Sequence, residues 1–326
     1  MGTRNFIAIG GSVGSVAAVK QLLSQLPVGF APSVFIALHV GARGSNLLAD
    51  IFAENAPIPV TTAVDSETIE AGHVYVAPAD RHLIVSQGLI WLGKGPRENL
   101  SRPAIDPLFR SVGADYGAAS IGLVLSGMLN DGAAGLADLK RCGGIAIVQN
   151  PADAEAPDMP VGALAATDVD YRASLADLPK LLVKLVGEPA GSSPPVADDI
   201  KLEIDIALGR QSGAAVIAEI AGAVPLSCPS CGGVLSQIKS SPPLRFRCQV
   251  GHAFTSDVLA SDEEGTVTGA VRMALRVIEE RITLSEKMAE DARRSGRKAA
   301  ALANEKRAEE SRGYAEVLRR GLAEGF

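Results

Sequence analysis

Residues 6–14 read FIAIGGSVG, and this short stretch decides the fold class. The apolar run Phe6 to Gly10 predicts a buried strand, and a helix is expected from Val16 to Leu26. Between them, Gly10-Gly11-Ser12-Val13-Gly14 fits G-x-S-x-G, in which glycines allow a tight turn that bulky side chains would block. A strand, a glycine turn carrying a serine and a helix are typical of α/β hydrolases with an exposed nucleophile.

Two other interpretations of this turn remain open. Glycines at the same place bind a dinucleotide in Rossmann folds, but that motif needs G-x-G spacing and usually an acidic residue at the end of the second strand, where this chain has His39. Alternatively, Ser12 caps the following helix. Short motifs often match by chance, so the local sequence does not decide among the three.

The alternation of strands and helices continues along the chain. Through about residue 185, apolar strand-like runs alternate with amphipathic helical segments, as in βαβ units with a parallel sheet. Further strands are predicted at residues 33–38, 74–78, 83–85, 89–92, 121–126 and 145–149. The runs from Val74 to Leu92 leave no room for helices, so we expect an antiparallel hairpin there, attached to the sheet. The predicted fold class is α/β, a doubly wound, mostly parallel sheet with this hairpin, followed by a small zinc-ribbon-like module and a C-terminal helical hairpin.

Two more residues with catalytic chemistry stand at predicted strand ends. A serine hydroxyl needs a base close by and a carboxylate that orients the base. His39 ends the second strand, and Asp131 follows a third long apolar run in a glycine-bearing loop. Taken alone, His39 reads as a surface residue and Asp131 as a helix cap, with Asp106 as a rival carboxylate. Ligand sites form outside the carboxyl ends of parallel strands, and all three residues follow predicted strands. Their shared position favours a triad of Ser12, His39 and Asp131.

Composition divides the chain into four parts. Residues 1–186 form the predicted catalytic domain, and residues 187–200, rich in Pro, Gly and Ser, form a linker. Residues 201–260 form a cysteine-bearing module, and residues 261–326 form a helical tail. Apolar residues recur at helical spacing in the tail, and Gly296 marks a turn, which together predict a helical hairpin.

Three of the four cysteines cluster with a histidine. Cys228 and Cys231 form C-x-x-C, and Cys248 and His252 follow as C-x-x-x-H after a 16-residue loop. Four soft ligands at zinc-ribbon spacing suit tetrahedral Zn²⁺, and the full set predicts a structural ion, since a catalytic zinc keeps one position for water. A redox C-x-x-C is the alternative, although the surrounding sequence does not resemble thioredoxin.

Whole-chain composition narrows the class of protein. The formal net charge of −6 argues against nucleic-acid binding, which needs clustered Lys and Arg. No signal peptide and no apolar run long enough for membrane insertion are present in the sequence. The few cysteines also do not suggest a disulfide framework. We therefore expect a cytoplasmic protein with structural Zn²⁺ and no cofactor for catalysis.

Several motifs, in order and correctly spaced, resemble one known family. This family is the catalytic domain of the chemotaxis-receptor methylesterase, the CheB type, and the resemblance covers nearly all of residues 5–186. It rests on the runs Ala8 to Ser12, Leu38-His39, Gly72 to Pro78, Arg81-His82, Arg102 to Val112, Leu125 to Met128, Asn130 to Leu136, Gln149-Asn150 and Met159-Pro160.

The resemblance implies hydrolysis of glutamate methyl esters on chemoreceptor helices with release of methanol, and in some members deamidation of receptor glutamines. It implies Ser12 as the nucleophile, His39 as the base and Asp131 as the residue that orients the base. The backbone N–H groups near Val13 and Met128 are the candidates for the oxyanion hole. The expected partner is a methylated chemoreceptor or a similar helical signalling protein.

The sequence departs from the family pattern around the cleft. Val13-Gly14-Ser15 stands where Thr-Gly-Gly usually follows the serine, Val40-Gly41 where Met-Pro usually follows the histidine, and Leu129 in place of a small residue. The predicted catalytic strand begins at Phe6, so we expect no N-terminal receiver domain of the usual kind and expect control by a separate regulator. Two alternatives stay open, namely a catalytically altered regulatory or binding protein on the same fold, and an esterase or deamidase for a substrate outside chemotaxis.

Overall fold

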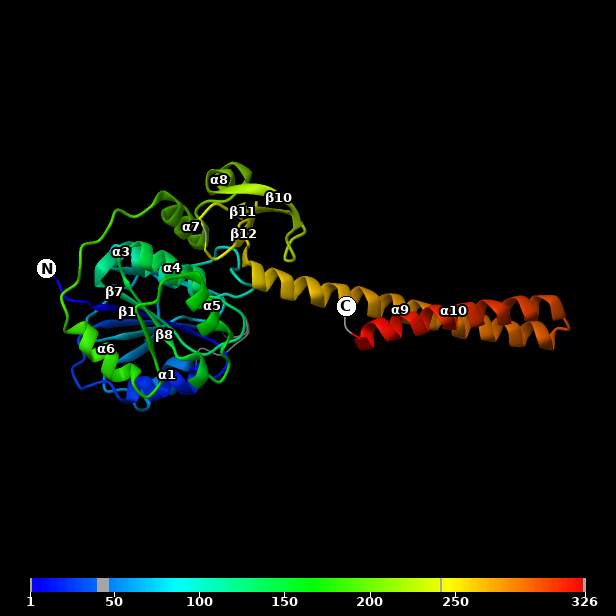
Figure 1. Cartoon of the computed structure of the whole chain (residues 1–326), viewed down its shortest axis with the longest axis horizontal. Helices are drawn as coiled ribbons and strands as arrows, with labels where there is room; N and C mark the ends of the chain where they lie inside the picture. The colour runs from blue at the N-terminus through cyan, green and yellow to red at the C-terminus, as the bar shows by residue number, and fades with distance from the viewer. Residues whose placement is uncertain (1, 40–46, 241, 325–326) are drawn as a thin grey trace. The chain divides into compact units, whose positions relative to one another are not determined.

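The computed structural model describes residues 2–39, 47–240 and 242–324. The chain divides into two compact units, Met1–Val258 and Leu259–Phe326 (Figure 1). The first unit contains a large parallel sheet and a smaller antiparallel sheet, and the second is helical. Across the described ranges, no helix combines the length and the apolar character that crossing a bilayer requires.

A sheet of seven parallel strands forms the centre of the first unit, in the order β3-β4-β2-β1-β7-β8-β9. The strands are β1 Phe6–Gly11, β2 Ser33–Leu38, β3 Val60–Thr62, β4 Val74–Val76, β7 Ser120–Val124, β8 Ile145–Gln149 and β9 Tyr171–Ala173. β1 lies between β2 and β7, with Gly11 opposite Leu38 and Gly10 opposite Val124. The carboxyl ends of these three central strands therefore meet at one edge of the sheet.

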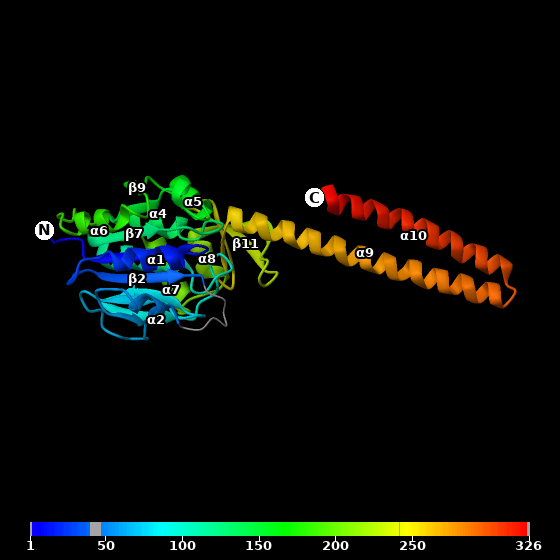
Figure 2. The ribbon, with the colours of Figure 1, turned by 90° about the horizontal axis from the view of Figure 1, so that it is seen from below.

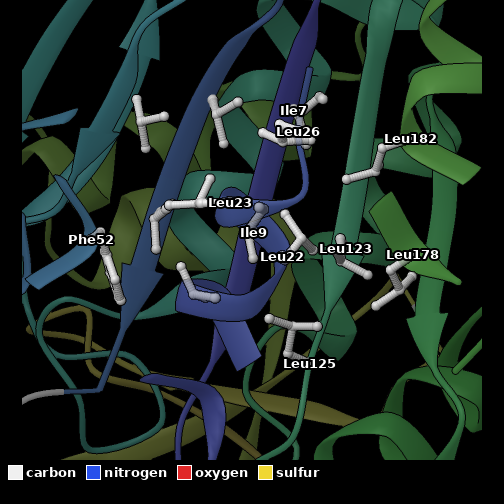
Figure 3. Close-up of a cluster of buried hydrophobic side chains, with 14 of the residues drawn as sticks. Ile7, Ile9, Leu22, Leu23, Leu26, Phe52, Leu123, Leu125, Leu178 and Leu182 are labelled. Carbon is white, nitrogen blue, oxygen red and sulfur yellow. The ribbon is translucent and has the colours of Figure 1, made fainter. Parts of the chain in front are cut away.

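Helices cover both faces of this sheet (Figures 1 and 2). One face carries α1 Ser15–Ser24, α2 Leu48–Ala53 and α6 Leu178–Val186, and the other carries α3 Ile105–Tyr116, α4 Ala133–Arg141 and α5 Asp158–Ala166. Side chains alternate along β1, so Ile7 and Ile9 pack toward α1 and α6 whereas Ala8 packs toward α3. Figure 3 shows the first of these cores, in which the two isoleucines lie among Leu22, Leu23, Leu178 and Leu182.

An antiparallel hairpin of β5 His82–Ser86 and β6 Leu89–Gly93 packs against α3 as a separate two-stranded sheet. The predicted hairpin is therefore confirmed for this segment, but the prediction was wrong to include the run that starts at Val74 and to attach the hairpin to the main sheet. That run is β4, which joins the central sheet in parallel. The chain between β3 and β4 crosses over without a helix, so spacing along the sequence does not distinguish this crossover from a hairpin.

A small module follows the α/β part of the first unit. α7 Asp198–Leu208 and α8 Ala214–Ile220 precede an antiparallel sheet with the strand order β10-β11-β12-β13. Its strands are β10 Ala221–Ser227, β11 Val234–Ile238, β12 Arg245–Cys248 and β13 Ala253–Thr255. The module thus carries the cysteine cluster on a compact sheet within the same unit as the α/β part.

Six buried charged side chains, here called the buried ion cluster, join this module to the α/β part. They are the carboxylates Glu98, Asp138 and Glu203 and the guanidinium groups Arg110, Arg245 and Arg247. Arg247 of β12 reaches Glu98 at 2.8 Å and Glu203 at 2.6 Å. Burial alone would raise the pKa of Glu203, but the three guanidinium charges hold it well below its usual value. Three positive and three negative charges therefore neutralise one another away from water.

The second unit is a pair of long helices. They are α9 Ser256–Arg294, which begins in the first unit, and α10 Lys298–Glu324, with Gly296 at φ 72° in the turn between them. The helices lie side by side (Figure 2), and ion pairs such as Arg312–Glu286 link them. Small buried side chains occupy the space between the helices, namely Ala289, Ala292, Ala301, Ala308 and Ala315. The predicted helical hairpin is confirmed.

Candidate active site

Ser12 lies in the turn between β1 and α1. Its N–H donates to the carbonyl oxygen of Ser126 at 2.9 Å, which ties this turn to the loop after β7. Gly14 lies immediately before α1 in a left-handed conformation with φ 79°, which a residue with a Cβ rarely adopts. Among the residues that the structure describes, no side-chain hydrogen bond caps α1, so the Ser12 hydroxyl is not used as its helix cap.

His39 follows β2 directly, beside this turn. Because β1 and β2 pair Gly11 with Leu38, Ser12 and His39 are the next residues on two adjacent strands. Nε2 of His39 lies 2.6 Å from Oδ2 of Asp131. The His39 side chain is 20% exposed and that of Asp131 only 2%, so the imidazole is open to a substrate while the carboxylate is not.

Asp131 comes from the loop after β7, on the other side of β1. Besides His39, its carboxylate accepts hydrogen bonds from Nδ2 of Asn99 at 2.8 Å and from the N–H groups of Ile105 at 2.7 Å and Asp106 at 3.4 Å. Burial alone would raise the pKa of Asp131, but these bonds and the His39 charge lower it below its usual value. The Asp131 carboxylate stays ionised and holds the imidazole proton of His39 on Nε2. Nδ1 of His39 is therefore the nitrogen that can accept a second proton.

The interpretation of Asp131 as a cap of its own helix is not supported. Gly132, with φ 91°, lies immediately before α4, and no side chain of the described residues caps this helix. Asp131 instead binds the first N–H groups of α3, where the helix dipole favours negative charge. The rival carboxylate Asp106 accepts the N–H of Gly135 at 2.6 Å and Nδ2 of Asn99 at 2.9 Å. Burial and the charge of Asp131 raise the pKa of Asp106 to about 8, so Asp106 is mostly uncharged near neutral pH.

The amides of Val13 and Met128 lie on the two loops that meet at Ser12. Val13 follows Ser12 in the chain, and Met128 belongs to the loop that accepts the Ser12 N–H. That loop is close, because a Cβ at Gly127 would lie 2.9 Å from Cβ of Ser12. Within the part of the chain that the structure describes, neither amide has a hydrogen-bond acceptor. Free N–H groups beside a nucleophile suit an oxyanion hole.

Two departures from the family pattern can be placed in the structure. Val13, directly after Ser12, is 43% exposed. Leu129 adopts φ 60°, a backbone region that is uncommon for branched side chains. A small residue would fit there with less strain, which gives a physical reason for the usual pattern. Val40 and Gly41 lie outside the described residues.

The other two histidines of the α/β part have structural partners. His82 is fully buried, with Nε2 donating to the Pro96 oxygen at 3.0 Å and Nδ1 accepting the Ala104 N–H at 3.3 Å. Burial lowers the pKa of His82, which keeps it neutral. Nε2 of His73 lies 2.9 Å from Oγ1 of Thr61.

The predicted metal ligands come together in the module. Their ligand atoms all lie within 4.8 Å of one another. Sγ of Cys248 is 3.7 Å from Sγ of Cys231 and 3.5 Å from Nδ1 of His252, which is 3.8 Å from Sγ of Cys228. A tetrahedral Zn²⁺ with its usual bond lengths separates sulfur and nitrogen ligands by about 3.6–3.8 Å, so the four residues fit this ion. Cys142 is buried elsewhere, and burial raises its pKa to about 11.

Sequence reasoning did not identify two residues that support this site. Asn99 donates to Asp131, and the N–H of Thr255 donates to Oδ1 of Asn99 at 3.0 Å. Neither residue belongs to a recognisable motif or to a hydrophobic period. The only available signal was a polar Asn99 three residues before the Arg102-Pro103 motif.

Known proteins are similar to the α/β part of the chain. A family model described as CheB methylesterase matches residues 7–182. A Leptospira interrogans relative named "Putative protein-glutamate methylesterase/protein-glutamine glutaminase" is 39% identical over 180 residues, covering 55% of this chain and 93% of the relative. The Hydrogenovibrio crunogenus protein-glutamate methylesterase/protein-glutamine glutaminase is 36% identical over 184 residues, covering 55% of this chain and 49% of the relative.

A solved structure also resembles the first unit. The crystal structure of the Thermotoga maritima CheB methylesterase catalytic domain matches with a TM-score of 0.54 and 27% identity, covering 57% of this chain and 100% of that chain. The family-model match includes Ser12, His39 and Asp131 and ends before the cysteine module. The similarity therefore concerns the α/β part.

Proposed function

Because the chain belongs to the CheB methylesterase family, we propose that it removes methyl esters from glutamate side chains of chemoreceptor-type proteins, with Ser12 as the nucleophile. Family membership makes the chain a carboxylic ester hydrolase. The observation that carries the residue assignment is the 2.6 Å contact between Nε2 of His39 and Oδ2 of Asp131, at the ends of the two strands that flank the strand of Ser12. An imidazole oriented by an ionised carboxylate is the base that a serine nucleophile needs.

The proposed reaction has two halves. In the first, the Ser12 oxygen attacks the ester carbonyl while Nδ1 of His39 takes the hydroxyl proton. His39 then gives this proton to the departing methoxide, so methanol leaves and an acyl-enzyme remains. In the second half, His39 deprotonates a water that attacks the acyl group, which frees the glutamate and restores Ser12. Asp131 keeps the imidazole in the required tautomer and stabilises it when it is charged.

The amides of Val13 and Met128 would stabilise the negative charge on the carbonyl oxygen in both halves. One such donor typically contributes about 3 kcal/mol to transition-state stabilisation. A receptor glutamine can follow the same route with ammonia as the leaving group. Deamidation is therefore proposed as a second reaction of the same site.

The proposed partner is a methylated chemoreceptor or a similar helical signalling protein, and the proposed location is the cytoplasm. The exposure of Val13 and Met128, 43% and 59%, on the loops that meet at Ser12 supports a protein substrate. A separate protein is proposed to regulate the activity.

The experiment that tests this function measures methanol released from a receptor fragment carrying glutamate methyl esters. The folded chain is expected to release one methanol per ester, and an unmethylated fragment serves as the control. A folded chain that binds the fragment and releases no methanol would instead support the alternative of a binding protein.

We also propose that the Cys3His cluster holds a structural Zn²⁺. Four protein ligands leave no position for water, so this ion would stabilise the module and take no part in ester hydrolysis. Cys228 and Cys231 lie between β10 and β11, Cys248 is the last residue of β12, and His252 lies between β12 and β13. The ion would therefore link the two turns of the small sheet.

The purified chain is expected to contain about one zinc ion, measured by elemental mass spectrometry. Cys231→Ala removes one ligand and is expected to lower both the zinc content and the melting temperature, because metal binding contributes to the folding free energy. Cys142→Ala removes a thiol outside the cluster and should keep the zinc. Equal zinc content in Cys231→Ala and the unaltered chain would contradict the proposed ligand set.

A further inference from the structure

We infer that the Cys3His module positions the catalytic aspartate, because Thr255 of this module holds the two asparagines that fix Asp131 in place, Asn99 and Asn130. The inference rests on the proposed function, since it concerns the orientation of Asp131 in the proposed triad with Ser12 and His39. Thr255, Asn99 and Asn130 are positioning residues that act through Asp131. The module therefore sets the catalytic rate as well as its own stability.

The amide of Asn99 is the first connection. Nδ2 donates to Oδ1 of Asp131 at 2.8 Å and to Oδ2 of Asp106 at 2.9 Å, while Oδ1 accepts the N–H of Thr255 at 3.0 Å. A flipped amide would place its oxygen against two carboxyl groups and its NH₂ against another donor. Because a backbone N–H can only donate, Thr255 selects the orientation in which Asn99 donates to Asp131.

The side chain of Asn130 is the second connection. The Thr255 hydroxyl donates to Oδ1 of Asn130, and Nδ2 of Asn130 donates to Oδ2 of Asp257 at 2.6 Å. Thr255 is 1% exposed and Asn130 5%, so water does not substitute readily for these bonds. Asn130 immediately precedes Asp131, and holding its side chain restrains the backbone that carries the carboxylate.

The cysteine cluster lies on the same hairpin as Thr255. Cys248 ends β12, and its N–H donates to the His252 oxygen at 3.0 Å across the turn into β13. Ala253 of β13 accepts the N–H of Asn99 at 2.8 Å. A metal ion bound by Cys248 and His252 would close this turn three residues before Thr255. The placement of Thr255 against Asn99 therefore depends on metal loading.

Removal of the metal is expected to lower kcat for ester hydrolysis about 10²-fold, because a displacement of about 1 Å at a catalytic group has an effect of this size. KM should change less than about twofold, since no substrate contact is altered.

Thr255→Val removes the hydroxyl bond to Asn130 and is expected to lower kcat about tenfold, whereas Thr255→Ser keeps that hydroxyl and should retain the rate. Equal rates for the Val and Ser variants would contradict the role of Thr255.

A mutant cycle separates positioning from general stability. The unaltered chain and Asn99→Ala are each assayed with Zn²⁺ and after chelation. Because Asn99 carries most of the effect, chelation is expected to lower kcat about 10²-fold in the unaltered chain and at most about tenfold in Asn99→Ala. Equal losses in the two backgrounds would overturn the inference, because the metal would then act independently of Asn99.

Hydrogen exchange provides a readout that does not depend on activity. Chelation is expected to speed exchange of the Thr255 amide while the amides of β1 remain protected. Loss of protection in β1 as well would overturn the inference, since the module would then act through the stability of the whole unit. Full activity in Ser12→Ala would contradict the proposed function. That result would not alter the outcome of the exchange experiment, so the two failures can be told apart.

Discussion

Replacing Ser12 by alanine is expected to lower the rate of methanol release from a methylated receptor fragment at least ~10³-fold. Without the hydroxyl no acyl-enzyme forms, and His39 and Asp131 have no nucleophile to activate. A small residual rate is expected, because free amides at Val13 and Met128 still stabilise negative charge on the carbonyl oxygen. KM should change little, since the hydroxyl adds little to ground-state binding.

Ser24→Ala is the matched control for this substitution. Ser24 is exposed at the end of α1, and its hydroxyl donates a hydrogen bond to the nearby Gln21 oxygen. Its activity should equal that of the unaltered chain. A folded Ser12→Ala protein within tenfold of the normal rate would show that another residue attacks the ester.

Glu203→Gln is expected to lower the free energy of unfolding by about 3–5 kcal/mol, which is typical when one member of a buried charge network is removed. Arg110, Arg245 and Arg247 all contact Glu203 and would then keep excess positive charge in a region closed to water. Urea unfolding at neutral pH measures the change. Glu219→Gln, at an exposed position on α8, is the control and should stay within about 0.5 kcal/mol.

The same cluster predicts how stability depends on pH. Burial alone would raise the pKa values of Glu98 and Glu203. The nearby arginine charges outweigh burial, so both pKa values lie below the usual 4.5. The unfolded chain therefore takes up protons first as the pH falls, so this stabilisation is complete above the unfolded pKa and is lost below it. Glu203→Gln should show a shallower loss of stability below about pH 4.5. An equally steep loss in Glu203→Gln would exclude Glu203 as a source of acid sensitivity.

The central strands could be predicted because they are continuous apolar runs bounded by glycine or polar residues. Ser33–Leu38 and Ile145–Gln149 have the predicted bounds, and β1 is one residue longer than predicted. β3 and β9 were not predicted, since each has only three residues and lies at an edge of the sheet, with little apolar signal. The parallel pairing of β4 also depends on a crossover without a helix, which local spacing does not reveal.

The candidate site was only partly accessible from the sequence. Ser12, His39 and Asp131 each follow a predicted strand, and that pattern is local. Asn99 and Thr255 are 156 residues apart, and their contact depends on the module folding against the α/β part. The buried ion cluster is hidden for the same reason, because charged residues normally indicate a solvated surface.

Labelling with a fluorophosphonate probe tests most directly whether His39 and Asp131 activate Ser12. Peptide mass spectrometry of the labelled chain is expected to find the probe on Ser12, with much slower labelling in Asp131→Asn. In that variant the NH₂ group would face two of the four donors from which the carboxylate now accepts hydrogen bonds. A folded chain that takes no label at Ser12, or an Asp131→Asn variant labelled at the normal rate, would contradict the proposed hydrolase mechanism.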